Sequence, residues 1–247
     1  MPQRSAEDIN PYSDDSRAKT EQVRDMFDSI APAYDFMNSA MSFGIHRRWL
    51  AEAVNTVARQ DPKSILDVAT GTADVAIRLA RQIPGASVTG IDLSQGMIDI
   101  GAKKVAQAGL DGRIVLRQAD CLALPFDDNS FDCVTVAYGV RNFERLADGY
   151  REMLRVLKPG GLLVVIELST PQSAVVRPFY NFYTRRIIPL VGRLVSKDVR
   201  AYSYLPESIA AVAQRSDMTD LMSSVGFTDA TFRQFTLGVC CLYTARK

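Results

Sequence analysis

The feature that most constrains this chain is an apolar run closed by a glycine turn, with an acid at the end of the next apolar run. Ile65–Asp74 reads ILDVATGTAD, and the following run closes on Gly90–Asp92 as GID. Gly71 and Asp92 stand about 20 residues apart, the spacing at which an acid binds a ribose in nucleotide-binding folds. A glycine lets the backbone pass close to a ligand, and a carboxylate can accept hydrogen bonds from both ribose hydroxyls. The spacing therefore predicts a strand–turn–helix–strand unit that binds a nucleoside.

The same turn indicates which nucleoside to expect. A dinucleotide site needs a Gly-x-Gly-x-x-Gly turn to admit a pyrophosphate, and this turn offers only Gly71. A ligand without phosphates fits better, which points to S-adenosylmethionine. Asp120 follows a third apolar run, where an acid would accept from the adenine amino group and the next backbone N–H would meet a ring nitrogen. An ordinary turn with incidental loop acids is the alternative, but Asp67, Asp92 and Asp120 each end a strand at the edge where open α/β sheets bind ligands.

Composition excludes several other classes of function. The chain has 247 residues, 47% of them hydrophobic, and a net charge of +1, so it should fold as an α/β domain without a field that attracts nucleic acid. His46 is the only histidine, which leaves little for a histidine metal site or a catalytic triad, and we expect no metal. The polar N-terminus lacks the apolar core of a signal peptide. No stretch approaches the ~20 apolar residues of a membrane span, and these features predict a cytoplasmic protein.

Strand-like and helix-like patterns alternate from Ser64 onward, which argues for a parallel sheet covered by helices. The expected strands are Ser64–Ala69, Ser87–Ile91, Ile114–Gln118, Cys133–Tyr138, Leu162–Glu167, Phe232–Phe235 and Val239–Ala245. The expected helices are Asp74–Gln82, Gln95–Ala108, Leu146–Leu157 and a final one near Ser208–Ser224. The last two strands read as a hairpin. We predict a seven-stranded, mostly parallel α/β sheet with a C-terminal antiparallel hairpin, the Rossmann-like fold of class I S-adenosylmethionine-dependent methyltransferases.

Added helices are expected outside this core. Residues 1–22 are predicted to be a flexible polar tail, and residues 23–247 a single methyltransferase domain. Within that domain, residues 23–60 are helical in pattern and rich in aromatics, so we expect an N-terminal helical cap. Residues 171–207 are too long for a simple connection, and an insertion of that kind usually forms a lid or a substrate wall.

Arg141 and Asn142 follow the fourth expected strand and point at the same edge of the sheet. Because its guanidinium stays charged, Arg141 cannot act as a free base. It could stabilise a phenolate, or hold a water that takes up a proton. The alternative is a structural arginine that pairs with an acid on its own helix. The acids in question are Glu144, Asp148 and Glu152.

Several longer motifs carry a more specific signal. They are VRDMFDSIAPAYDFMN at Val23–Asn38, SFGIHRRW at Ser42–Trp49, YGVRNF at Tyr138–Phe143, RVLKPGG at Arg155–Gly161 and YSYLPESI at Tyr202–Ile209. Together they resemble the signatures of the quinone-biosynthesis C-methyltransferases, the family that makes menaquinone and ubiquinone. The resemblance runs from about Val23 to the C-terminus. The Lys-Pro-Gly-Gly turn is shared by many methyltransferases, whereas the Tyr-Asp-x-Met-Asn and Gly-x-Arg-Asn elements are much more restrictive.

This resemblance implies which residues contact S-adenosylmethionine. Carried over position by position, it assigns cofactor contacts to Thr72, Asp92, Asp120 and Cys121. The family often has serine where this chain has Ala137, and often alanine where it has Cys121. The full set of expected cofactor-binding residues is Asp67, Thr70, Gly71, Thr72, Asp92, Leu93, Asp120, Cys121 and Ala137.

The resemblance also implies the reaction, which is C-methylation of demethylmenaquinol to menaquinol. A hydroquinone ring carbon becomes nucleophilic once the neighbouring hydroxyl loses its proton, so the protein must align the reactants and help that proton leave. Proton handling is expected from Arg141 acting through a water, with Tyr34, His46 and Tyr204 as alternates. Three other readings stay open. They are additional methylation of 2-polyprenyl-6-methoxy-1,4-benzoquinol for ubiquinone, another lipophilic acceptor such as a sterol or phospholipid amine, and a cofactor-binding subunit without activity.

A polyprenylated naphthoquinol is insoluble, so the enzyme must meet a membrane. Residues 171–200 mix bulky apolar residues with arginines, which suits an interfacial helix whose arginines meet anionic headgroups. The alternative is a lid that packs onto the core, and Pro178 and Pro189 should break or bend a helix there. We expect a lid with transient membrane contact, peripheral association with the inner face of the membrane, and a homodimer as a further expectation.

Overall fold

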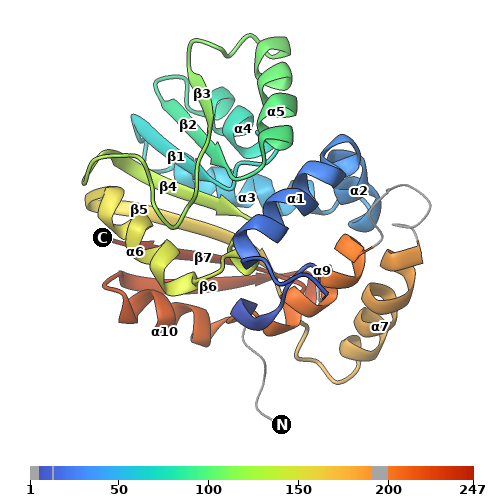
Figure 1. Ribbon diagram of the computed structural model, residues 1–247. Coiled ribbons are helices and arrows are strands. Elements are labelled where there is room, and N and C mark those ends of the chain that lie inside the picture. Colours follow the sequence, from blue (N-terminus) through green and yellow to red (C-terminus); the bar gives the residue numbers. More distant parts are fainter. Residues whose placement is uncertain (1–5, 13, 191–199) are drawn as a thin grey trace.

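The computed structural model describes residues 6–12, 14–190 and 200–247, and a seven-stranded sheet forms its centre. The strands are β1 (Ser64–Val68), β2 (Ser87–Asp92), β3 (Ile114–Gln118), β4 (Phe131–Ala137), β5 (Leu157–Leu168), β6 (Thr228–Phe235) and β7 (Cys240–Arg246). Across the sheet their order is β3-β2-β1-β4-β5-β7-β6 (Figure 1). Strand β7 runs antiparallel to β5 and β6, while the other neighbouring pairs are parallel. This arrangement confirms the predicted fold class.

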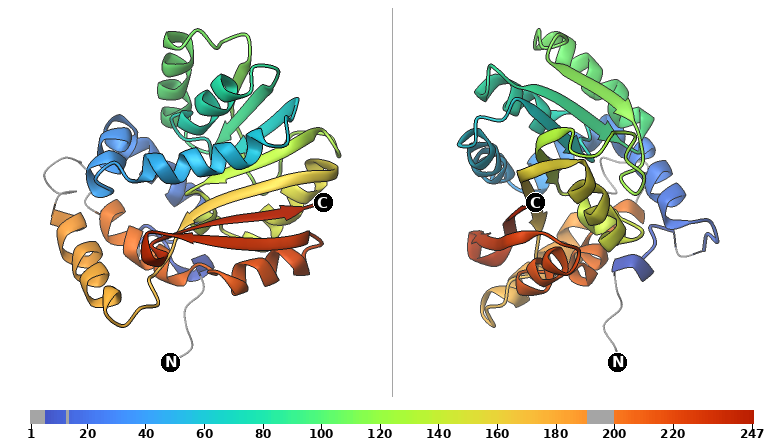
Figure 2. Two further views of the ribbon diagram at one scale, coloured as in Figure 1. Left: turned by 180° about the vertical axis from the view of Figure 1, so that it is seen from behind. Right: turned by 90° about the vertical axis from the view of Figure 1, so that its left-hand side faces the viewer.

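The central strands are apolar on both faces because helices cover both sides of the sheet. On one face lie α3 (His46–Ala58), α4 (Asp74–Gln82) and α5 (Gln95–Gln107), and on the other lie α6 (Leu146–Val156) and α10 (Ser216–Ser224) (Figure 2). Strand β4 shows the consequence, since five of its seven residues are buried. Packing against the two helical layers therefore holds the sheet in place and sets the direction in which its strand ends point.

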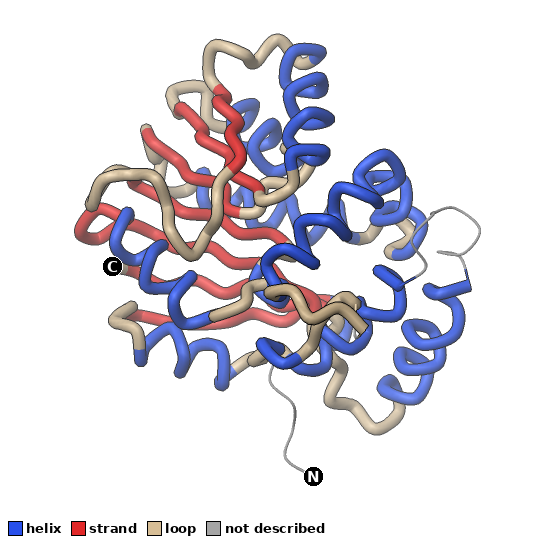
Figure 3. Tube along the Cα trace, viewed as in Figure 1, coloured by secondary structure: helices blue, strands red, loops and turns tan. Residues whose placement is uncertain are grey.

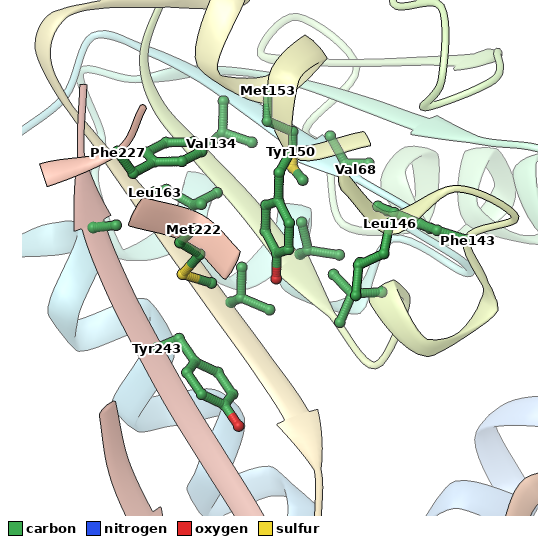
Figure 4. Close-up of a cluster of buried hydrophobic side chains, with 14 of the residues drawn as sticks. Val68, Val134, Phe143, Leu146, Tyr150, Met153, Leu163, Met222, Phe227 and Tyr243 are labelled. Atoms are coloured by element: carbon green, nitrogen blue, oxygen red, sulfur yellow. The ribbon is translucent and has the colours of Figure 1, made fainter. Parts of the chain in front are cut away.

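The core on the α6 side is packed around large side chains. Tyr150 of α6 is fully buried, and its ring meets Phe227 edge-on at 6.3 Å between centroids. Met153, Met222 and Val134 surround this pair (Figure 4). Truncating such a side chain typically costs about 2–5 kcal/mol of stability.

A third group of helices lies beyond the carboxyl ends of the parallel strands (Figures 1 and 3). It consists of α1 (Lys19–Ile30), α2 (Tyr34–Met41), α7 (Val176–Phe182) and α9 (Arg200–Ala211). Helices α1, α2 and α9 share a buried cluster, to which Met26, Met37 and Tyr204 belong, together with Ile188 beyond α7. Part of the segment expected to be a polar tail joins it, because Ile9 and Tyr12 are buried there. The cap helices α1 and α2 and the lid helices α7 and α9 therefore cover the sheet edge where the predicted site lies.

Two details of the helices differ from the sequence expectation. The single helix predicted near Ser208–Ser224 is wrong, because α9 and α10 are separate helices. The chain turns between them at Arg215, whose φ is +56° and whose backbone N–H donates to the hydroxyl of Tyr243 at 2.8 Å.

The expected breaks at Pro178 and Pro189 take a milder form. Pro178 lies in the first turn of α7, where its missing N–H needs no helical partner. Before Pro189 the chain forms a π-helical turn at Tyr183–Ile187, the kind of irregularity that accompanies a bent helix. The predicted lid continues over residues 191–199, which lie outside the described residues.

Candidate functional site

The turn after β1 is held by the buried carboxylate of Asp67. Its two oxygens accept hydrogen bonds from the hydroxyls of Thr70 and Thr135, each at 2.6 Å. The turn then passes through left-handed backbone at Ala69 (φ +53°) and Gly71 (φ +55°). Burial raises the pKa of Asp67 to about 6. Asp67 therefore shapes the glycine turn, with its oxygens already engaged by the two threonines.

Asp92 ends β2 and faces this turn. One carboxylate oxygen accepts from the backbone N–H of Gly71 at 2.9 Å, and the other accepts from the backbone N–H of Ser94 at 2.9 Å. Burial raises the pKa of Asp92 to about 6, although these backbone hydrogen bonds oppose the rise. Each oxygen retains capacity for a further hydrogen bond, so the carboxylate can still receive two ribose hydroxyls.

A cavity of about 700 Å³ opens in front of Asp92. Of the predicted cofactor-binding residues, six line it: Gly71, Asp92, Leu93, Asp120, Cys121 and Ala137. The remaining walls are largely apolar and include Ile91, Met97, Ala119, Leu122 and Phe143. A carboxylate beside a glycine turn, with apolar walls for a flat base, fits the nucleoside part of S-adenosylmethionine.

The other three predicted residues, Asp67, Thr70 and Thr72, line a smaller adjoining cavity. Its wall also includes Gly71, so the two spaces meet at the glycine turn. The hydroxyl of Thr72 donates to Asp35 of α2 at 2.6 Å and accepts from Lys104 of α5 at 3.0 Å. Thr72 thereby links the turn to the helical cap.

A second large cavity, which we call the chamber, lies under α1, α2 and α9 and has a volume of about 1210 Å³. All four predicted catalytic residues, Arg141, Tyr34, His46 and Tyr204, line it. Most of the remaining wall is apolar: Met26, Ile30, Met37, Met41, Trp49, Leu168, Ile188, Leu205, Ile209 and Val239. The chamber and the nucleoside cavity have four wall residues in common, namely Phe27, Tyr34, Tyr138 and Asn142. A ligand in either cavity can therefore contact these four shared residues.

Unpaired polar atoms gather on this chamber. Within the described residues, four buried side-chain atoms have no hydrogen-bond partner: Tyr138 Oη, Arg141 Nε, Asn142 Oδ1 and Tyr204 Oη. All four belong to residues that line the chamber. Since buried polar groups without partners are costly, the cluster indicates where the polar head of a mostly apolar ligand binds.

Arg141 is fixed by Glu167 rather than by the acids of its own helix. Its Nη1 donates to Glu167 Oε1 at 2.9 Å, and both side chains are almost fully buried. Burial is the largest single influence and disfavours the charged guanidinium, but Glu167, Tyr34 and Tyr204 together outweigh it and raise the pKa of Arg141. The alternative pairing within the helix is wrong, because the three acids bind elsewhere: Glu144 to Thr20, Asp148 to Arg145 and Arg151, and Glu152 to Arg155.

The other predicted catalytic groups differ in protonation. Burial raises the pKa of the Tyr34 and Tyr204 hydroxyls, so both stay protonated and can donate hydrogen bonds. Burial lowers the pKa of His46, and the Arg47 guanidinium lowers it further. His46 is therefore neutral near pH 7 and is able to accept a proton.

Sequence reasoning did not assign site roles to Tyr138, Asn142 or Glu167. Tyr138 and Asn142 flank Arg141 in the YGVRNF motif, which was the available signal. Glu167 lies near the carboxyl end of the fifth strand, and Asp92 likewise ends the second strand. An acid at a strand end was therefore the sequence signal for Glu167. Its pairing with Arg141 depends on the adjacency of β4 and β5, which the sequence does not state.

Comparisons with known proteins identify the family to which the chain is similar. The family model described as the ubiE/COQ5 methyltransferase family matches residues 15–247. A protein of Bacteroides fragilis named demethylmenaquinone methyltransferase is 47% identical, over 98% of this chain and 98% of its own length. A protein of Porphyromonas gingivalis with the same name is 49% identical, over 98% and 99%. The ubiquinone/menaquinone biosynthesis C-methyltransferase UbiE of Geobacter sulfurreducens is 46% identical, over 93% and 90%.

Solved structures share the fold at low sequence identity. The [4+2]-cyclase SpnF aligns with a TM-score of 0.66 at 18% identity, over 92% of this chain and 96% of its own. A SAM-dependent methyltransferase from Aquifex aeolicus aligns with a TM-score of 0.57 at 16% identity, over 78% and 88%. At such identities the likeness concerns the fold alone.

Proposed function

The chain belongs to the ubiE/COQ5 methyltransferase family and is an S-adenosylmethionine-dependent methyltransferase, and from this premise we propose that it methylates demethylmenaquinol to menaquinol. The two relatives at 47% and 49% identity carry that activity in their names. The observation that carries the proposal is the chamber, an apolar space that shares a wall with the nucleoside cavity. Its wall holds the four side-chain atoms that are buried and unpaired within the described residues. A naphthoquinol has the matching shape, because its ring bears two polar oxygens and its tail is apolar.

The residues that would hold S-adenosylmethionine follow from the cavity. Asp92 would accept the ribose hydroxyls, Asp120 would accept from the adenine amino group, and the backbone of Gly71 would allow close approach. Thr72 and the glycine turn would border the amino-acid end. When bound, the cofactor supplies an electrophilic methyl group on a sulfonium.

The chain's own residues prepare the acceptor. Within the part of the chain that the structure describes, the Nε–H of Arg141 is unpaired and Glu167 fixes the guanidinium. The Nε–H can therefore donate to a quinol oxygen as that oxygen becomes a phenolate. A phenolate pushes electron density onto the neighbouring ring carbon, which is then the nucleophile. The Tyr204 hydroxyl and the Asn142 amide provide further hydrogen-bonding groups for the ring oxygens.

The test is methyl transfer from labelled S-adenosylmethionine to reduced demethylmenaquinone by the purified chain. We expect a labelled menaquinol. A parallel reaction with 2-polyprenyl-6-methoxy-1,4-benzoquinol tests the bifunctional alternative, which the name of the Geobacter sulfurreducens relative raises. Cofactor binding without transfer to either quinol would contradict the proposal and leave another lipophilic acceptor.

We also propose that the chain contacts a membrane surface beside the chamber. The apolar patch consists of large side chains that are more than half exposed: Phe36, Phe43, Val175, Phe179, Phe182 and Leu190. Its two parts, at α2 and at α7, lie on the same side of the molecule in Figures 1 and 2. They touch where the Phe43 and Tyr183 rings pack at 6.0 Å and the Tyr183 hydroxyl donates to the Met41 carbonyl at 3.0 Å.

Charge supports lipid as the occupant of the apolar patch. Residues 171–190 contain no acid, and Arg177, Arg185 and Arg186 are exposed beside the aromatic rings. Arginines next to exposed aromatics suit a surface with anionic headgroups. Because Tyr183 and Thr184 also line the chamber, a bound bilayer would lie beside the place where the tail must enter. None of the helices in the described residues has the length and apolarity to cross a bilayer.

Sedimentation with phosphatidylcholine vesicles containing phosphatidylglycerol tests this contact. Phe179→Ser should lower vesicle binding about tenfold, because a buried phenyl group contributes roughly 1.5–3 kcal/mol. Leu237→Ser is the matched control, since Leu237 is 74% exposed, like Phe179, but belongs to the β6–β7 hairpin. Equal losses in the two variants would contradict the proposal. Dissociation of a homodimer by Phe179→Ser would instead assign the apolar patch to a second copy of the chain.

A further inference from the structure

His46, at the first position of α3, is hydrogen-bonded through a short chain of atoms. Its Nδ1 lies 2.6 Å from Ser42 Oγ, and Ser42 Oγ donates to the backbone carbonyl of Asn38 at 2.6 Å. The described part of the chain gives His46 Nε2 no hydrogen-bond partner. Both His46 and Ser42 line the chamber.

This chain of atoms fixes the tautomer of the imidazole. A serine hydroxyl has one proton, and the Asn38 carbonyl can only accept, so the Ser42 proton lies on the side of Asn38. The hydroxyl oxygen must then accept from His46, which places the imidazole proton on Nδ1. The lone pair is therefore on Nε2. The same hydrogen bond persists when the ring is doubly protonated, because Nδ1 remains a donor.

We propose that His46 Nε2 accepts the hydroxyl proton of the quinol, and that Ser42 is the positioning residue that keeps Nε2 unprotonated. The inference rests on the proposed function, because it concerns the proton of that substrate. Among the predicted catalytic groups, Arg141 is permanently charged, and Tyr34 and Tyr204 stay protonated. The Glu167 carboxylate already accepts from Arg141 and from the backbone N–H of Leu168.

The quinol O–H bond breaks, its proton goes to His46 Nε2, and the electron pair stays on the oxygen beside Arg141. The neighbouring ring carbon forms a bond to the methyl group, and the sulfur keeps the electrons of the broken S–C bond. The ring carbon then loses its hydrogen as a proton to water, which restores the aromatic ring as a phenolate. His46 returns its proton to that oxygen, so one proton leaves overall.

Four charged groups face His46 and set its titration. Arg47 on α3 and Arg78 on α4 lower the pKa of the imidazole, while Asp74 on α4 and Asp35 on α2 raise it. Burial is the largest influence and also lowers the pKa. Because His46 acts as a base when neutral, kcat should fall on the acid side, below the ordinary imidazole pKa of 6.5.

The first test is nitrogen-15 NMR of the imidazole, which needs no substrate. The chain contains one histidine, so its ring signals are unambiguous. We expect a protonated Nδ1 and an unprotonated Nε2 at pH 7.5, and a mixture of tautomers in Ser42→Ala. Ser39→Ala is the matched control, because this serine lies in the last turn of α2, which ends just before Ser42, and is outside the chamber. An Nε2–H tautomer in the unmodified protein would overturn the inference.

The second test is kinetic, at saturating cofactor. His46→Asn keeps a side-chain N–H for Ser42 but removes the base, so kcat should fall about 100-fold and lose its acid limb. Ser42→Ala should lower kcat several-fold with little change in KM, and Ser42→Thr should restore it. An unchanged kcat in His46→Asn, from an enzyme that methylates demethylmenaquinol, would overturn the inference alone. Absence of methyl transfer by the unmodified chain would overturn the proposed function, while the NMR result would still report the tautomer.

Discussion

At the scale of single residues, Arg141 divides its guanidinium between two tasks. Nη1 pairs with Glu167, while Nε–H has no partner among the described residues and belongs to a residue of the chamber wall. A planar group with fixed donors suits this division, whereas a lysine ammonium is one compact charge on a flexible stem. The geometry therefore requires arginine rather than positive charge alone.

Arg141→Lys should lower kcat about 100-fold, which is the usual loss when one donor to a developing oxyanion is removed. S-adenosylmethionine affinity should change little, because Arg141 does not line the nucleoside cavity. Steady-state kinetics and calorimetric cofactor titration separate the two effects. Arg145→Lys is the control, since Arg145 is exposed and pairs with Asp148. An unchanged kcat in Arg141→Lys would show that Nε–H does not meet the substrate.

Glu167→Gln should destabilise the protein by about 3–5 kcal/mol, because it leaves a buried arginine without its counter-charge. Urea unfolding measures the difference. Asp148→Asn is the matched control, because it breaks two exposed ion pairs, with Arg145 and Arg151, and should lower the free energy of unfolding far less. Equal effects in the two variants would mean that Arg141 finds another partner when Glu167 is neutral.

Some of these residues could be predicted from sequence and others could not. Asp92 and Asp120 were identifiable because each follows an apolar run at a strand end, and both line the nucleoside cavity. Tyr138 was not assigned to the site, because its place on both cavity walls depends on a left-handed backbone with φ of +58°. A non-glycine residue rarely adopts that conformation, so residue type gave no indication of it.

At the scale of elements, the alternation of strands and helices was predictable because burial on both faces makes the central strands continuously apolar. For β5 the sequence predicts a start at Leu162, which is too late, because Pro159 and the two glycines after it indicate a break. The strand instead begins at Leu157, where Phe131 of β4 pairs with it before a shift in register. The break at Arg215 had no proline or glycine to announce it.

The cap helix α1 is fastened to the nucleoside site by Asp28. One oxygen of Asp28 accepts from the Ser94 hydroxyl at 2.5 Å and from the Gly96 backbone N–H at 2.9 Å, at the start of α5. Ser94 also donates its backbone N–H to Asp92. The same short segment therefore holds both α1 and the carboxylate of Asp92, which we propose binds the ribose.

Asp28→Ala should loosen α1 and speed S-adenosylmethionine dissociation several-fold, because losing a helix-terminal cap costs about 1 kcal/mol. Stopped-flow release and the rate of proteolysis within α1 measure the change. Asp25→Ala is the matched control, because Asp25 lies one turn earlier on α1 and pairs with Arg17 and Arg24. Identical release rates in the two variants would contradict a role for Asp28 in cofactor retention.

At the scale of the whole molecule, two buried carboxylates link stability to pH. Burial raises the pKa of both Asp67 and Asp92 from 3.8 to about 6. The folded state therefore binds protons more tightly than the unfolded chain between these values. The free energy of unfolding should rise as pH falls toward 5 and decline as pH rises through 6. His46 has the opposite sign, because its lowered pKa costs stability as pH falls below 6.5.

Other shifted groups act outside this range. The pKa of Asp132 is lowered to about 2 by hydrogen bonds from Lys158 and Ser64 that outweigh burial, so its contribution changes only below 3.8. Burial lowers the pKa of Lys19 to about 8, so its contribution changes between 8 and 10.5. Between pH 5.5 and 7.5, the pH dependence of stability therefore comes from the two aspartates, opposed by His46.

Without cofactor, the free energy of unfolding should be higher at pH 5.5 than at pH 7.5 by about 1 kcal/mol, with Asp92→Asn reducing the difference.

The stabilisation provided by bound S-adenosylmethionine should depend on pH in the opposite direction. Ribose hydroxyls donate best to an ionised Asp92, so protonation near pH 6 weakens binding and shrinks the stabilisation that bound cofactor provides. The rise in Tm on adding cofactor should accordingly be larger at pH 7.5 than at 5.5. A cofactor-induced rise that is independent of pH would mean that Asp92 stays ionised throughout, or that the ribose is bound elsewhere.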